Sequence, residues 1–292
     1  MLTPEEIAKK VKELEIVSKK ISTHLFAGEY HAAFRGKGMR FREVREYYPG
    51  DDVRFIDWNV SARYAHPFSK VFEEERELTV MIMVDISEST FFGTVNRLKR
   101  DLIIEVAAVL TFSAINNNDK VGVIFFSDKM EKFIPPKGGR EHAFYIVREL
   151  LTAIPKRKQT DIGEALECFG KNTRQKSIAF ILSDFLDGDY AHKLRVLGQR
   201  HEIIGLRVYD KMDSVLPNIG MVKVEEAESG KSIWADTSNA MVRHRYHQDF
   251  LKRSAECKNI FTKAGAELLH LQTNEDYVKV LKQFFKRRKI KR

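Results

Sequence analysis

One stretch of the sequence, Leu78 to Thr90 (LTVMIMVDISEST), restricts the fold more than any other. It begins with a continuous apolar run, 80–84, which is typical of a strand buried on both faces of a parallel sheet. An acid and two hydroxyls follow at alternate positions, Asp85, Ser87 and Ser89. Ligands of open α/β sheets bind at the carboxyl ends of the strands, and alternate residues of an extended turn point the same way. The stretch therefore predicts an oxygen-rich site suited to a hard divalent cation.

From residue 78 onward, apolar runs alternate with amphipathic helical patterns. We expect strands over 78–84, 121–126, 132–135, 178–183, 202–208, 222–224, 232–235 and 267–271, and helices over about 96–116, 140–153, 162–169, 190–200, 241–264 and 275–288. Because strands that alternate with helices form right-handed crossovers, the fold class is α/β, with a mainly parallel central sheet flanked by helices.

The first 77 residues differ from the rest of the chain in composition and in their expected secondary structure. Residues 3–23 predict an amphipathic helix that docks onto a core, capped by Thr3. Residues 24–77 are rich in turns, arginines, acids and aromatics, with strands expected at 39–47 and 71–77. Since 24–77 has few apolar residues, we expect two domains: an N-terminal segment, 1–77, packed on the main α/β domain, 78–292. The two tryptophans, Trp58 and Trp234, are interpreted as buried anchors.

Charge and composition indicate a soluble cytoplasmic protein. The chain of 292 residues has a net charge of +9, but six positive charges lie in 286–292, which leaves +3 for the rest (9 − 6). The basic tail is interpreted as a solvated helix end, the alternative being a weak contact with anionic lipid, RNA or an acidic partner. Cys168 and Cys257 form no C-x-x-C pair, which fits a reducing compartment. Neither a membrane span nor a signal-peptide apolar region is found.

Two further segments carry oxygen ligands at matching places. Thr160 lies at a helix start in Thr160–Leu166 (TDIGEAL), and Asp184 follows the buried run 178–183. Each has a simple structural explanation, a helix cap for Thr160 and a turn for Asp184. Together with the first stretch, however, three strand-end loops supply Asp, Ser, Ser, Thr and Asp, so we expect them to converge on one point.

These residues resemble a known family. The five positions are similar to the metal-ion-dependent adhesion site of von Willebrand factor A domains. The segment 47–63, YYPGDDVRFIDWNVSAR, with the acidic run 73–77, resembles the signature of the bacterial domain of unknown function 58 (DUF58) family, which carries a von Willebrand A-like half. The resemblance covers most of the chain and implies a von Willebrand factor A-like fold with a loop- and strand-rich N-terminal extension.

The resemblance also implies a mechanism of partner binding without catalysis. The hydroxyls of Ser87, Ser89 and Thr160 would contact Mg²⁺ (or Mn²⁺ or Ca²⁺) directly, while Asp85 and Asp184 would act largely through water. An acidic side chain of a protein partner would fill the open position. The resemblance to this family implies that the partner is a MoxR-type AAA+ ATPase, which acts in protein maturation or in an envelope or stress function.

Two other classes of function stay open. Asp85 at a strand end could serve a Mg²⁺-dependent phosphoryl-transfer enzyme, but Ser87 stands where a phosphatase needs a second acid. The tail and the arginines could bind nucleic acid or anionic lipid, although in 24–77 the acids offset the arginines. The pair His244 and His247 has chelating spacing without a third ligand nearby, and is interpreted as part of a solvated basic face.

Overall fold

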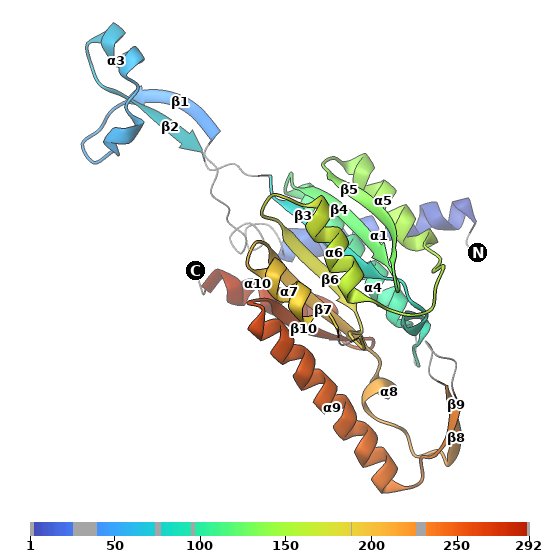
Figure 1. The fold of residues 1–292 in the computed structure, drawn as a ribbon. Coiled ribbons are helices and arrows are strands. Elements are labelled where there is room, and N and C mark those ends of the chain that lie inside the picture. The colour runs from blue at the N-terminus through green and yellow to red at the C-terminus, as the bar shows by residue number, and fades with distance from the viewer. Residues whose placement is uncertain are drawn as a thin grey trace. The chain divides into compact units, whose positions relative to one another are not determined.

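The protein is built around a six-stranded sheet (Figure 1). The computed structural model describes residues 3–25, 40–73, 77–94, 97–187, 189–225 and 232–290. The strand order is β10-β7-β6-β3-β4-β5, and only the β4–β5 pair is antiparallel. The strands are β3 (Thr79–Asp85), β4 (Lys120–Phe126), β5 (Met130–Lys137), β6 (Ile178–Ser183), β7 (Glu202–Tyr209) and β10 (Glu267–Gln272). The mainly parallel sheet confirms the expected fold class.

Helices cover both faces of this sheet (Figure 1). On one face α6 (Ile162–Asn172), α7 (Ala191–Gly198) and α9 (Ala240–Lys263) enclose a core with the odd-numbered side chains of β3, Met81 and Met83. On the other face lie α4 (Lys99–Asn116), α5 (Arg140–Thr152) and α10 (Tyr277–Ile290). Because successive side chains of β3 point to opposite faces of the sheet, they pack into a core on each face, and its apolar run is therefore unbroken.

The N-terminal helix α1 (Pro4–Leu25) docks onto α4 and α5, as its amphipathic pattern predicted. Its apolar stripe is centred on Val11, which packs with Phe112 of α4 and Val147 of α5. Glu15 of α1 also pairs with Arg140 of α5. The helix therefore belongs to the same packed unit as the sheet.

Residues 35–78 form a compact unit of their own, whereas residues 1–34 group with 79–292. The smaller unit pairs β1 (Arg40–Glu46) with β2 (Phe68–Glu73) and includes the 3₁₀ turn η1 (Val53–Phe55) and the helix α3 (Trp58–Tyr64). Asp57 caps α3, and Asp52 pairs with Arg54. In the described part of this unit only Ser69 is buried, in keeping with its few apolar residues. Whether the segment packs on the α/β domain stays a prediction.

A short helix and a hairpin follow β7. They are α8 (Lys211–Ser214) and the antiparallel pair β8 (Met221–Glu225) and β9 (Ser232–Asp236). The prediction of buried tryptophans was wrong, because Trp234 of this hairpin is 68% exposed and Trp58 is 72% exposed. A two-stranded hairpin has no second layer to cover its side chains, so an aromatic residue on it faces solvent.

Part of the basic tail, which lies in the C-terminal helix α10, is held by ion pairs. Arg288 of α10 pairs with Glu202 and, at 3.2 Å, with Glu267, so the basic tail is not wholly a solvated end.

None of the helices in the described ranges is long and apolar enough to pass through a lipid bilayer.

Candidate metal centre

The two acids of the predicted site lie at the switch point of the sheet. Asp85 ends β3 and Asp184 follows β6, and these strands are parallel neighbours. From β3 the chain proceeds to β4 on one side, and it later adds β6 on the other. Connections leave in opposite directions at such a point, which opens a crevice at the carboxyl edge, where ligands bind in α/β folds.

Asp85 is held almost fully buried, at 1% exposure. Its Oδ1 accepts from the Ser87 amide at 2.9 Å, and its Oδ2 accepts from the Ser183 hydroxyl at 2.6 Å. Burial, with a further contribution from the negative charge of Asp184, raises the pKa of Asp85 to about 7. The folded protein thus keeps a carboxyl where a negative charge is costly unless a cation lies nearby.

The two serines meet as the motif predicted, although the turn is not extended. A 3₁₀ turn, η2 (Glu88–Phe91), begins directly after Ser87, and the Ser87 and Ser89 Oγ atoms are still 3.1 Å apart. Both side chains are buried, at 0% and 4% exposure. Two hydroxyl oxygens at this separation can serve as adjacent ligands of one small cation.

Thr160 lies in the loop before α6, which backbone bonds attach to the ends of β3 and β4. The Lys158 carbonyl accepts from the Glu88 amide at 3.2 Å, and the Ser127 carbonyl accepts from the Asp161 amide at 2.8 Å. Asp161, not Thr160, caps α6, so the simple explanation of Thr160 as a helix cap was wrong. Thr160 Oγ1 is buried and has no hydrogen-bond partner among the described residues. A buried hydroxyl without a partner is costly, and a ligand would satisfy it.

Asp184 is oriented by a strained turn. The next residue, Phe185, has a φ of 54°, in the left-handed region that a bulky residue seldom adopts. Its ring is 5% exposed and packs edge-on against Phe261 of α9 at 5.3 Å, which holds the turn in place. Such strain at a strand end is characteristic of sites where a side chain must be aimed.

Sequence reasoning missed Lys99, the first residue of α4. Its ammonium is 2.9 Å from the Asp184 carboxylate and 3.5 Å from that of Asp213, and the residue is 2% exposed. Burial opposes the charge of Lys99, but Asp184 and Asp213 outweigh it and raise the pKa above its ordinary value. A lysine is disfavoured in the first turn of a helix by the helix dipole, and this was the signal available in the sequence.

Two further polar residues support the same edge. Arg207 of β7, 2% exposed, donates from Nε to the backbone carbonyl of Asp184 at 3.2 Å. Asp210 accepts from the hydroxyls of Thr94 and Thr273, at 2.5 and 2.7 Å, which joins the loop after η2 to the ends of β7 and β10. The loops at the carboxyl edge of the sheet are therefore joined by a hydrogen-bonded network.

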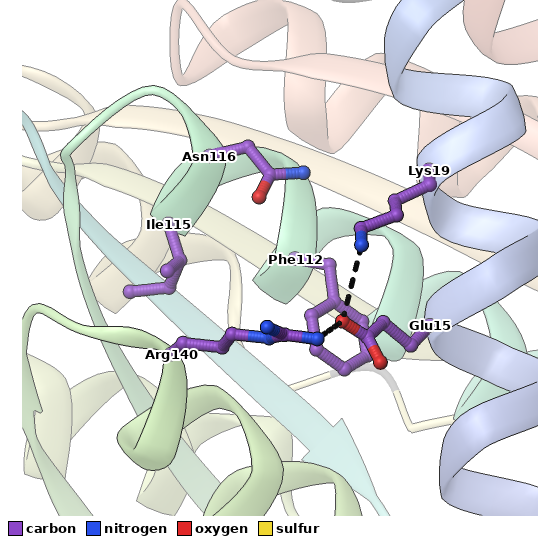
Figure 2. Close-up of a pocket in the computed structure, with 6 residues that line it drawn as sticks. All are labelled: Glu15, Lys19, Phe112, Ile115, Asn116 and Arg140. Carbon is purple, nitrogen blue, oxygen red and sulfur yellow. Dashed lines mark hydrogen bonds and ion pairs between the residues drawn. The ribbon is translucent and has the colours of Figure 1, made fainter.

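A separate cavity lies at the other end of α4. It has a volume of about 180 Å³ and is lined by Glu15, Lys19, Phe112, Ile115, Asn116 and Arg140. Figure 2 shows Glu15 turned toward both Lys19 and Arg140, so the charges in it are already paired. Since α4 rises about 1.5 Å per residue, Ile115 is about 24 Å along the helix from Lys99, and the cavity is not part of the strand-end site.

The donors at the edge fit a divalent cation. Three hydroxyls and two carboxylates give the all-oxygen set that Mg²⁺ prefers, and the partnerless Thr160 hydroxyl lies in a loop bonded to the turn that carries the two serines. In the described part of the chain no cluster of three or more His, Cys, Asp or Glu side chains is placed to hold a metal. The arrangement offers few direct negative charges.

The fold and the edge define the class: an α/β protein with a von Willebrand factor A-like sheet and buried acids and serines at the carboxyl ends of β3 and β6. Residues 43–256 match the family described as "Protein of unknown function DUF58". The chain belongs to this family, as its sequence signature indicated. An uncharacterized protein of Mycobacterium tuberculosis is 30% identical over 290 residues, which cover 96% of this chain and 89% of the relative. An uncharacterized Bacillus subtilis protein, YeaD, is 24% identical over 60% of this chain and 42% of its own length.

Solved structures agree on the fold. The conserved hypothetical protein BatB from Bacteroides thetaiotaomicron matches with a TM-score of 0.52 and 17% identity, over 74% of this chain and all (100%) of that one. An aerotolerance-related membrane protein from Bacteroides fragilis matches with a TM-score of 0.50 and 18% identity, over 74% of this chain and 100% of that chain. At such identities the likeness concerns the architecture alone.

Proposed function

We propose that the protein is a non-enzymatic interaction module that binds a partner through a divalent cation, Mg²⁺ or in its place Mn²⁺ or Ca²⁺. Ser87, Ser89 and Thr160 would hold the cation through their hydroxyls. Asp85 and Asp184 would balance its charge through water. The cation would supply an electron-poor centre for an acidic side chain of another protein.

The observation that carries this proposal is the buried Thr160 hydroxyl without a described partner, in a loop bonded to the Ser87–Ser89 turn. Buried polar groups are nearly always satisfied, so a ligand bound by this hydroxyl would remove the cost of leaving it unpaired. The buried Asp85 carboxyl, whose pKa is raised by burial and by Asp184, supports the same conclusion, since a nearby cation would offset both effects.

Calorimetric titration with Mg²⁺ and Mn²⁺ tests the metal site. Wild type should bind one ion, Asp85→Ala should not, and Thr160→Val should bind it at least about tenfold more weakly, since the variant lacks one direct ligand. The matched control is Thr111→Val, which removes another buried threonine hydroxyl, one bonded within α4 to the Ala107 carbonyl. Equal binding by wild type and Asp85→Ala, or none by either, would refute the metal site.

The partner we infer is a MoxR-type AAA+ ATPase, on the strength of family kinship, acting in protein maturation or an envelope or stress function. Co-purification of the two proteins in Mg²⁺, and its loss in EDTA and in Asp184→Ala, is the expected result. Binding that survives both EDTA and the variant would assign the contact to another surface.

The phosphoryl-transfer alternative has the same nucleophile, Asp85, and can be tested directly. Asp85 is 1% exposed, and its two oxygens already accept hydrogen bonds, which leaves little room for in-line attack. Incubation with Mg²⁺ and acetyl phosphate should therefore give neither turnover nor acid-stable labelling. Labelling that Asp85→Asn abolishes would overturn the proposal.

A further inference from the structure

We propose that Lys99 is a built-in competitor of the divalent cation, which holds Asp184 in the metal-free protein and keeps the metal affinity of the site low. The inference rests on the proposed function, because it assigns a regulator to that same metal site. It concerns a residue outside the five predicted ligands.

The geometry places Lys99 on the acid that the cation also needs. Its ammonium lies 2.9 Å from Asp184 Oδ2, and the two side chains are 3% and 4% exposed. Among the described residues, the remaining oxygen of Asp184, Oδ1, accepts a long contact of 3.4 Å from the Leu186 amide. The carboxylate of Asp184 is thus paired with Lys99, while its negative charge also acts on the nearby carboxyl of Asp85.

The position of Lys99 carries a cost that its two acidic partners offset. A buried ammonium loses its hydration, and a positive charge in the first turn of a helix opposes the helix dipole. Nearby, Arg207 already anchors Asp184, but by its backbone carbonyl, so that its donor is not directed at the carboxylate. Lys99 is therefore the cation that neutralises the carboxylate itself.

A second acid gives the ammonium an alternative acceptor. Asp213, in α8, lies 3.5 Å from Lys99, and its side chain is 28% exposed. The same Asp213 oxygen accepts from the Asp210 amide at 2.7 Å, which fixes it in place. When a divalent cation takes over the charge of Asp184, the ammonium can stay paired with Asp213, and repulsion between the two cations lowers the affinity of the site.

Two substitutions test this with metal alone as the probe. Lys99→Met removes the competitor, so the dissociation constant for Mg²⁺ should fall by about tenfold or more. The metal-free variant should also unfold at a lower temperature, because Asp184 is left buried without a partner, while added Mg²⁺ should raise its midpoint more than that of wild type. Asp213→Asn should act oppositely and weaken Mg²⁺ binding several-fold, since Lys99 then depends on Asp184 alone.

The controls separate charge from fold. Lys99→Arg keeps the charge and should bind Mg²⁺ as wild type does. Lys171→Met removes a lysine from an ion pair with Glu167 at the far end of α6 and should leave the affinity unchanged. If Lys99→Met does not fold, the direction of the Asp213→Asn effect decides.

The outcomes are distinct for the two proposals. Absence of metal binding in wild type overturns the proposed function. Wild-type binding with unchanged or weaker affinity in Lys99→Met, or with unchanged or tighter affinity in Asp213→Asn, overturns the role of Lys99 and leaves the proposed function standing.

Discussion

The Ser183 hydroxyl donates to the Asp85 carboxylate at 2.6 Å and accepts from the Phe185 amide at 3.1 Å. The residue immediately before one acid of the site therefore holds the other acid, across two neighbouring strands. Ser183 thus links the carboxylate of Asp85 to the backbone turn that carries Asp184.

We expect Ser183→Ala to lower the free energy of unfolding by about 1–3 kcal/mol, because it leaves a buried carboxylate oxygen without its donor. Urea denaturation without divalent cation measures this. The control is Ser214→Ala, which removes an exposed hydroxyl that donates to the Lys211 carbonyl and should change stability by less than about 0.5 kcal/mol. Equal effects of the two variants would mean that the Asp85 contact contributes nothing.

The stability of the cation-free protein should fall as the pH rises from about 4 to about 7. Burial and Asp184 raise the pKa of Asp85 to about 7 in the folded protein, whereas an unfolded aspartate titrates near roughly 3.9. In this pH range the folded state binds a proton that the unfolded state has released, so the free energy of unfolding decreases as the pH rises.

The variant Asp85→Asn isolates that effect from other titrating groups. It carries no charge at this position, so it should match wild type near pH 4 and be the more stable of the two at pH 7 and above. Chemical denaturation of both proteins in EDTA across this range gives the difference, and curves that run parallel would contradict the expectation.

Phe185→Ala should cost about 3–5 kcal/mol of unfolding free energy, because the ring fills a buried space against Tyr190 and Phe261. It should also weaken Mg²⁺ binding, since the packed ring is what holds the strained turn after Asp184. Leu186→Ala, at the neighbouring position with a side chain 48% exposed, is the control and should have a small effect on both. Thermal unfolding and calorimetry of the two variants decide this.

Trp234→Ala should leave the free energy of unfolding within about 0.5 kcal/mol of wild type, because the side chain is 68% exposed on the hairpin. Phe261→Ala, which removes a ring that is 1% exposed, should cost several times more. A large loss from Trp234→Ala would mean that this surface is covered in solution.

Most of the fold could be predicted from the sequence, since strands such as 80–84 and 178–183 are short apolar runs and helices such as α1 and α6 have an apolar stripe. The meeting of Ser87 with Ser89 was expected from an extended turn, whereas a 3₁₀ turn brings the two hydroxyls together. Lys99 could not be found in this way, because its partners, Asp184 and Asp213, are remote in sequence and their proximity depends on the strand order. Exposure of Trp234 was also out of reach, because an aromatic residue in a strand pattern does not reveal whether a second layer covers it.

The arrangement of α1 has a consequence for how the molecule assembles. Residues 35–78, a unit of their own, interrupt the chain between α1 and the rest of the α/β unit, so α1 is attached there by side-chain contacts rather than by a short connection. Its docking must close a long loop, which costs entropy that a neighbouring helix would not lose. Docking of α1 is therefore opposed by an entropic cost that helices next to their partners in the chain do not have, and hydrogen exchange along the chain should find its amides among the first to open.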